Sequence, residues 1–212
     1  MTLSVSVVIP TLDRKFFLIE AIESCLNQSH DLSQIIVVDN GSSDGTTGLM
    51  FPKKVILLQE ITKGAGFARN KGLTIADTSH VLFLDSDDLL TRTAIEELVE
   101  KAEKSQALIT YGRTVNFQKR NDEVLIGKSV QYPLASSTLI DVRTFETYGH
   151  FEGDNFSFPN WMIRLEKTAA KFEKTDELVC YRRVHESNMG RTKESAQYYL
   201  NLVKEKIAVR KE

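Results

Sequence analysis

Apolar residues in the first half of the chain fall into short runs that alternate with segments of helical spacing. Each run is too short for a helix, which is typical of strands buried on both faces of a parallel sheet. The runs predicted to be strands cover residues 4–9, 34–38, 54–58 and 81–85. The segments predicted to be helices cover residues 14–27, 64–76 and 91–104. This alternation predicts a mostly parallel sheet with helices on both of its faces.

The second half of the chain has a different pattern, which predicts a mixed set of strands. Residues 108–117 and 123–130 are separated by a polar turn, so we expect a β-hairpin there. The other predicted elements are a strand at 137–140, a helix at 141–148, an irregular loop at 149–158, a helix at 159–171, a strand at 177–184 and a final helix from about residue 193. The whole pattern predicts a single α/β domain over residues 1–212, with mostly parallel strands first and mixed strands later.

The composition is that of an ordinary globular protein, with 42% hydrophobic and 26% charged residues among 212. The net charge of −2 provides no basic face, so we do not expect nucleic-acid binding. Cys25 and Cys180 are expected to be buried thiols rather than a disulfide. The N-terminus does not have the pattern of a signal peptide, and no apolar run reaches the roughly 18 residues of a membrane span. We therefore expect a cytoplasmic protein.

The most informative stretch is the apolar run at 81–84, which leads directly into the carboxylates of Asp85, Asp87 and Asp88. If the backbone stays extended, Asp85 and Asp87 point to the same side. Carboxylates held this close repel one another, and a hard divalent cation such as Mg²⁺ or Mn²⁺ relieves the repulsion. The stretch therefore predicts a metal site that takes further ligands from substrate phosphates. The alternative is a solvated acidic turn.

Polar residues also follow the other predicted strands, at the edge where ligands bind in open parallel sheets. Thr11, Asp13 and Arg14 follow the first strand, and Asp39 and Asn40 follow the second. A buried carboxylate such as Asp39 needs a partner, which the imide of a pyrimidine base or a ribose hydroxyl could supply.

A glycine-rich turn follows the third strand and opens a helix that carries Arg69. Gly64 and Gly66 in this turn allow close approach of a ligand, and the helix N-terminus and Arg69 suit a nucleotide or its phosphates. Simple close packing is the other interpretation of the two glycines. The turn has neither the Gly-Lys-Ser/Thr of a P-loop nor the full spacing of a dinucleotide fingerprint.

Taken together, the motifs at 4–11, 36–46, 66–72 and 84–88 closely resemble those of the family 2 glycosyltransferases, which have the Rossmann-like GT-A fold. The resemblance is strongest over residues 4–104. It implies that residues 1–104 form a nucleotide-sugar-binding half and residues 105–212 an acceptor-side half. It also implies an inverting, metal-dependent transfer of a sugar from a nucleoside diphosphate sugar to a hydroxyl of a saccharide or lipid-linked saccharide acceptor, in polysaccharide or glycoconjugate synthesis.

The resemblance assigns roles to residues at the matching positions. Asp39 is expected to read the base, Thr11 to lie by the nucleoside and Arg69 to contact the nucleotide. The full set expected at the nucleotide sugar is Pro10, Thr11, Asp13, Arg14, Asp39, Asn40, Gly64, Arg69, Asp85, Ser86, Asp88 and Trp161. The stretch Asp85-Ser86-Asp87 matches the DXD motif that holds manganese or magnesium, and His185 is a further candidate ligand, so the expected metal ligands are Asp85, Asp87 and His185.

The chain departs from the family pattern at two places. Many members have two aspartates where this chain has Asp39-Asn40. The family's aspartate base precedes a tryptophan-bearing helix, but alignment on Trp161 places no carboxylate at the usual position. Asp154 is therefore the first candidate for the general base and Glu152 the second. Trp161 could offer a sugar a flat apolar face or could belong to the core.

Two further functions stay open at this point. The degenerate base motif allows a catalytically inactive nucleotide-sugar-binding protein of the same fold. A phosphatase with an aspartyl-phosphate intermediate also has an apolar strand ending in Asp-x-Asp, but this chain has Leu89 where such enzymes have threonine or valine. The final helix carries basic residues beside apolar ones, which suits either a peripheral membrane contact or a solvated face; they are Lys204, Lys206, Arg210 and Lys211.

Overall fold

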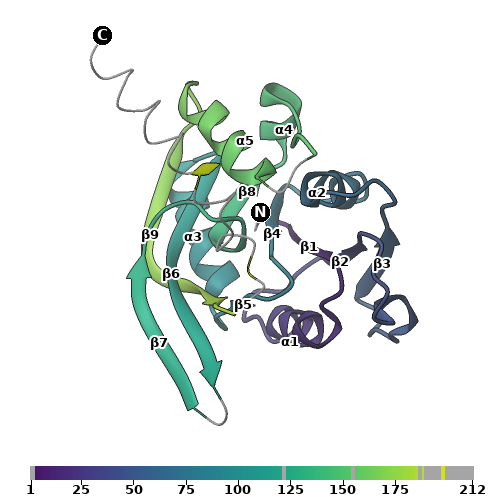
Figure 1. Ribbon diagram of the computed structural model, residues 1–212. Helices are drawn as coiled ribbons and strands as arrows, with labels where there is room; N and C mark the ends of the chain where they lie inside the picture. Colours follow the sequence, from purple (N-terminus) through teal and green to yellow (C-terminus); the bar gives the residue numbers. More distant parts are fainter. Residues whose placement is uncertain (1–2, 121–122, 154–155, 186–187, 189–196, 199–212) are drawn as a thin grey trace.

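The apolar runs of the first half form four adjacent parallel strands in the computed structural model (Figure 1). The structure describes residues 3–120, 123–153, 156–185, 188 and 197–198. The strands are β1 Val5–Thr11, β2 Gln34–Asp39, β3 Val55–Gln59 and β4 His80–Phe83. They lie in the order β3-β2-β1-β4, which confirms the predicted parallel half.

Helices cover both faces of these strands because the strands are apolar on both faces. The helices are α1 Lys15–Leu26, α2 Ala65–Leu73, α3 Ala94–Ser105, α4 Arg143–Tyr148 and α5 Ser157–Glu166. In β1, Val7 and Ile9 belong to one buried cluster with α1 and α3. Val8 points the other way and belongs to a second cluster with α2, α4 and α5. The alternation of side chains along one strand thus explains the two helical layers.

The second half extends the same sheet with strands of both directions. β8 Thr138–Asp141 is antiparallel to β4, β6 Ile109–Arg120 is antiparallel to β8, β9 Phe172–Arg183 is parallel to β6, and β5 Leu89–Leu90 is antiparallel to β9. β7 Glu123–Val130 pairs with β6 as the predicted hairpin. The fold is therefore the predicted single α/β domain with mixed C-terminal strands.

The C-terminal prediction cannot be compared with the structure, since most of the expected final helix from residue 193 lies outside the described residues. The same holds for its basic residues and for the membrane contact that they suggest. Of the helices in the described part of the chain, none is both long and apolar enough to span a bilayer.

The strand order reverses between β1 and β4, and this reversal locates the site. The chain runs from β1 outward to β2 and β3, and then returns to β4 on the other side of β1. Connections therefore leave the carboxyl ends of β1 and β4 in opposite directions and open a crevice between them. Ligands of open α/β sheets bind at such a switch point. Here Thr11 and the acidic stretch 85–88 border it.

Candidate functional site

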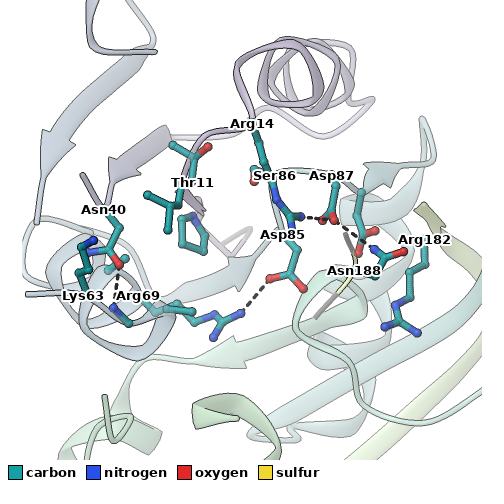
Figure 2. A pocket seen from close by; sticks show the side chains of 16 residues that line it. Thr11, Arg14, Asn40, Lys63, Arg69, Asp85, Ser86, Asp87, Arg182 and Asn188 are labelled. Carbon is teal, nitrogen blue, oxygen red and sulfur yellow. Dashed lines mark hydrogen bonds and ion pairs between the residues drawn. The ribbon is translucent and has the colours of Figure 1, made fainter. Parts of the chain in front are cut away.

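A cavity of about 450 Å³ lies at the switch point (Figure 2). This volume is in the range of small-molecule and cofactor sites. Its walls come from the ends of β1 and β2, the start of α2, the turn after β4 and the segment after β9. The lining residues are Pro10, Thr11, Leu12, Arg14, Asn40, Lys63, Gly64, Ala65, Ala68, Arg69, Asp85, Ser86, Asp87, Asp88, Arg182 and Asn188. The structure thus brings together most of the residues expected at the nucleotide sugar.

The acidic stretch is a tight turn, not the continuation of a strand. β4 ends at Phe83, and the amide of Asp88 donates a hydrogen bond to the carbonyl oxygen of Asp85 at 2.9 Å. The expectation that an extended backbone aims Asp85 and Asp87 to one side is therefore wrong. Figure 2 shows the two carboxylates meeting arginines from opposite walls, Arg69 at Asp85 (2.8 Å) and Arg14 at Asp87. Both carboxylates still line the cavity.

Asp87 has the densest set of polar partners in the site. Its carboxylate pairs with Arg14, and its Oδ2 lies 2.9 Å from Nε2 of His185 and 3.3 Å from Nδ2 of Asn188. Only 5% of Asp87 is exposed, so these partners replace the water that the charge has lost. The fold therefore brings His185 to Asp87 across 98 residues, and the metal-ligand role of the two side chains stays a prediction.

Asp88 connects the turn to η2 (Ala135–Ser137) and β9 by hydrogen bonds. It accepts hydrogen bonds from the hydroxyl of Ser136 (2.7 Å) and from the amide of Arg183 (3.0 Å). Burial, followed by the nearby charges of Asp87 and Asp85, raises the pKa of Asp88 well above its ordinary value. The raised pKa reflects the cost of placing a third carboxylate in this buried turn.

Arg183 ties the turn to two other elements. Its guanidinium lies between the rings of Phe17 (4.8 Å) and Phe117 (4.6 Å), donates to the carbonyl oxygen of Asp87 and pairs with Glu20. A fully engaged, buried arginine is not available to an anion. The preceding residue, Arg182, does line the cavity.

Asn40 explains why this chain has an asparagine where many family members have a second aspartate. Its Nδ2 donates to the carbonyl oxygens of Glu60 and Thr62, both at 2.8 Å, and its Oδ1 accepts from the amide of Gly64 at 2.8 Å. A carboxylate has no N–H and could not donate to the two carbonyls. Asn40 therefore fixes the loop that leads from β3 into α2.

Two buried polar atoms at the cavity have no hydrogen-bond partner among the described residues. They are the hydroxyl of Thr11 and Nε of Arg69, on side chains that are 3% and 4% exposed as whole residues. Buried polar groups are nearly always paired, so unpaired ones in a cavity wall suit a ligand that supplies the partner. Both residues were expected at the nucleotide.

Asp13 and Asp39 lie beside the cavity and are not among the residues that line it. Asp39 is buried and accepts a hydrogen bond from the amide of Ser42 at 3.2 Å. Asp13 accepts from the amide of Ser43 at 2.6 Å, with a left-handed backbone at φ 51°. Both carboxylates shape the loop after β2, and the base-reading role of Asp39 stays a prediction.

The start of α2 packs directly against the segment that precedes α5. Gly64 has φ +135°, and a Cβ there would lie 1.9 Å from the carbonyl oxygen of Gly153, so only glycine fits. The side-chain amide of Asn70 donates to the carbonyl oxygen of Phe151 and accepts from its amide, and Arg69 donates to the hydroxyl of Ser157 at 3.0 Å. The close-packing interpretation of the glycine-rich turn is confirmed, and its nucleotide-binding role stays a prediction.

Of the two candidate bases, the structure describes Glu152 but not Asp154. Glu152 is exposed, pairs with Arg164 of α5 and is not among the lining residues. Asp154 lies outside the described residues, and its role stays a prediction. Phe151, three residues earlier in the chain, is held to α2 by Asn70.

Trp161 lies in the core, which corrects its placement at the nucleotide sugar. It is 1% exposed, stacks on Phe145 with ring centroids 4.7 Å apart, and its Nε1 donates to the carbonyl oxygen of Gly149 at 2.8 Å. The cause is the apolar face of α5, where Phe158 and Leu165 are buried with it. An indole that is packed on all sides offers no face to a sugar.

Several lining residues were not among the expected site residues. Lys63 opens the glycine-rich turn, whose composition was the available signal. Asn188 contacts Asp87 from a segment with no recognisable pattern, so nothing in the sequence singled it out. Leu12, Ala65 and Ala68 contribute apolar wall and belong to elements placed correctly for other reasons.

The metal expected at Asp85, Asp87 and His185 stays a prediction. Within the described part of the chain there is no group of three or more His, Cys, Asp or Glu side chains that could enclose an ion. Asp85, Asp87 and the nearby His185 therefore could not form a complete protein cage. They suit Mg²⁺ or Mn²⁺, which are commonly held by one or two carboxylates together with substrate phosphates and water.

The comparison with protein families identifies the class of this protein. Residues 6–163 match the model of glycosyl transferase family 2, and the chain belongs to that family. Of the curated relatives, it is 26% identical over 208 residues to a UDP-Glc:α-D-GlcNAc-diphosphoundecaprenol β-1,3-glucosyltransferase, WfaP, of Escherichia coli, covering 89% of this chain and 80% of that one.

Two further similarities concern longer proteins. The chain is 31% identical over 121 residues to glycosyltransferase GlyG of Streptococcus pneumoniae, covering 54% of this chain and 40% of GlyG. Its fold matches S. aureus TarS, solved with UDP-GlcNAc, at a TM-score of 0.72 and 16% identity, covering 87% of this chain and 60% of that one. The chain therefore spans less than half of GlyG, and the TarS match establishes the GT-A fold.

Proposed function

We propose that this protein transfers a sugar from a nucleoside diphosphate sugar to an acceptor hydroxyl, with inversion and with the help of Mg²⁺ or Mn²⁺. The observation that carries the proposal is the cavity at the switch point, where an acidic turn faces cationic side chains. Arg14, Lys63, Arg69 and Arg182 line the same cavity as Asp85 and Asp87. This arrangement suits a diphosphate, whose negative charge needs cations around it.

Different walls of the cavity suit different parts of the nucleotide sugar. The unpaired hydroxyl of Thr11 and the end of β2 form the wall that suits a nucleoside. Lys63 and Arg182 form the wall that suits phosphates, because Arg14 and Arg69 already pair with Asp87 and Asp85. Asp85 and Asp87, with His185, would hold the metal, which neutralises charge on the leaving diphosphate. Arg69 would keep Asp85 oriented, because it is itself fixed by Ser157.

The stereochemistry follows from a single displacement. If the acceptor oxygen attacks the anomeric carbon from the face opposite the diphosphate, the configuration inverts in one step. A general base beside the acceptor then takes the hydroxyl proton. Asp154 is the proposed base, since the chain leads to it from Phe151, which Asn70 fixes next to the start of α2.

Asp154→Asn is expected to lower kcat by about 100-fold or more, in the range typical of a lost general base, while the donor Kd changes little. Glu152→Gln is the matched control because Glu152 pairs with Arg164 at the surface and should leave kcat nearly unchanged. Steady-state rates with a saturating donor, together with donor titration, measure both. Equal losses in kcat and donor affinity for Asp154→Asn, or a larger kcat loss for Glu152→Gln, contradict the assignment.

The donor and acceptor are proposed from the relatives. TarS was solved with UDP-GlcNAc, and the name of WfaP gives UDP-glucose as its donor and a lipid diphosphate-linked sugar as its acceptor. We therefore propose a uridine diphosphate sugar as donor and a saccharide, free or lipid-linked, as acceptor. A cytoplasmic location, at the membrane face when the acceptor is lipid-linked, is consistent with this but stays a prediction.

The experiment that tests the function is a donor screen. Purified protein is incubated with UDP-glucose, UDP-GlcNAc and UDP-galactose, with Mn²⁺, Mg²⁺ or EDTA, and with sugar acceptors or undecaprenyl diphosphate-linked GlcNAc. Release of UDP that needs both a metal and an acceptor supports the proposal. Donor binding without turnover across all acceptors supports the inactive binding protein instead. Turnover that is unaffected by EDTA removes the metal from the proposal.

Thr11→Val is expected to weaken donor binding by roughly 2- to 10-fold, the loss of one ordinary hydrogen bond. The reason is that the hydroxyl of Thr11 is buried and has no partner in the described structure, so a bound nucleoside is its natural partner. The thermal stability of the ligand-free variant should not fall, since no internal hydrogen bond is lost. Calorimetric titration with UDP and a melting curve measure the two effects, and unchanged UDP affinity would remove Thr11 from the site.

A further inference from the structure

The hairpin of β6 and β7 projects from the body of the molecule (Figure 1). β9 pairs with β6 only as far as Phe117, so the part of the hairpin beyond it is a two-stranded ribbon. Within the described part of the chain, β7 pairs with β6 alone. The outer edge of β7 therefore presents unpaired backbone N–H and C=O groups, which are a template for another strand.

The exposed edge is also apolar. Val124, Leu125 and Ile126 follow one another in β7, and their exposed fractions are 57%, 47% and 61%. Because neighbours along a strand point to opposite faces, the ribbon is apolar on both faces at the same place. Edge strands of this kind are normally interrupted by proline or covered, and β7 contains no proline. Its exposure calls for a partner.

We propose that β7 pairs antiparallel with β7 of a second copy of this chain, about a two-fold axis at Leu125. The register itself argues for a second copy. A two-fold axis perpendicular to the ribbon brings Leu125 opposite Leu125 and Val124 opposite Ile126, so apolar residues meet apolar residues on each face. If the axis lies at Val124 instead, Leu125 of one copy faces Glu123 of the other, and the apolar match is lost on that face of the ribbon.

Charges at the ends of the same register are complementary. Between the pairs Phe117↔Ile126 and Val115↔Ser129, one residue of β6, Asn116, faces two of β7, Gly127 and Lys128. This bulge falls opposite Glu123 of the second copy when Leu125 is at the axis. Glu123 of each copy then lies beside Lys128 of the other, at both ends of the contact.

The proposed contact limits the assembly to two copies. The other edge of β7 is already occupied by β6, so two copies satisfy each other and no third strand can add to β7. The paired segment is short compared with the 1,200–2,000 Å², roughly, of a stable interface. We therefore expect a dimer that forms and dissociates with protein concentration.

A cysteine at the axis provides the first test. Leu125→Cys places two thiols directly opposite each other, at a distance that suits a disulfide. The native Cys25 and Cys180 are buried and do not compete. Met50→Cys is the control, since Met50 is 97% exposed and lies far from β7 in the sequence. Under mild oxidation of dilute protein, Leu125→Cys should give a covalent dimer at least about tenfold faster than Met50→Cys.

Charge exchange provides the second test. Glu123→Lys puts like charges at both ends of the contact and should weaken dimerisation by roughly tenfold, while the double variant Glu123→Lys/Lys128→Glu should restore it. Sedimentation at a series of protein concentrations measures the association, and circular dichroism confirms the fold. A monomer at every concentration overturns the proposal. So does equal cross-linking of the two cysteine variants, or a monomer that binds phospholipid vesicles through the hairpin instead.

Discussion

Asp87→Asn is expected to lower metal-stimulated donor turnover by at least about 100-fold, the typical cost of losing a group that stabilises transition-state charge. Asn keeps the shape of Asp87 and one acceptor oxygen, so the turn at 85–88 should persist. What disappears is the negative charge that pairs with Arg14 and that would hold the cation. The substitution therefore separates the electrostatic role from the structural one.

The control for this prediction is Asp141→Asn. Asp141 is also a buried aspartate at the end of a strand, and it also pairs with an arginine, Arg143, but it does not line the cavity. Its replacement should leave the rate per folded molecule within about twofold, as for residues away from the chemistry. Rates with and without Mn²⁺ are compared for both variants. If Asp87→Asn retains the stimulation by metal, the proposed metal site is wrong.

Trp161→Ala is expected to lower the free energy of unfolding by about 3–5 kcal/mol, the usual range for truncating a buried tryptophan. The indole is enclosed by the rings of Phe145, Phe151 and Phe158, and its N–H is satisfied by the carbonyl of Gly149. The substitution removes the ring contacts and the hydrogen bond to Gly149, and it leaves a cavity. Trp161→Phe should cost clearly less because it keeps most of the apolar volume.

Urea unfolding of both variants measures the effect, and Tyr132→Ala serves as the control. Tyr132 is an aromatic residue with 48% exposure, and its truncation should change the free energy of unfolding by about 0.5 kcal/mol or less. One outcome would return Trp161 to the sugar-contacting role that the sequence suggested. If Trp161→Ala keeps its stability but loses acceptor-dependent turnover, the side chain is part of the site and not of the core.

Much of the fold could be predicted because its strands follow a simple hydrophobic rule. β1, β2 and β4 are buried on both faces, so their apolar runs are continuous and end at polar residues. β5 was missed because its two residues, Leu89 and Leu90, are too short for any pattern. β9 begins at Phe172, earlier than expected, because its first half is polar and partly exposed and is a strand only through its pairing with β6.

The site could be predicted as far as strand ends and motifs go, and no further. Residues that follow β1, β2 and β4 were identified correctly as neighbours because parallel strands end at one edge. Hydrogen bonds across long separations were not predictable. Asn188 reaches Asp87 from 101 residues away, and Ser136 reaches Asp88 from 48. These contacts depend on how the second half of the chain packs against the turn at 85–88, and local sequence patterns do not encode that packing.

The three hydrogen bonds of Asn40 couple position 40 to the loop at 60–64. An aspartate introduced alone at position 40 would face two carbonyl oxygens, those of Glu60 and Thr62, with nothing to donate. The loop that delivers Lys63 and Gly64 to the cavity would then lose its attachment. An aspartate at position 40 is therefore compatible with an attached loop only if residues 60–64 change as well, so the two segments are structurally coupled across twenty residues.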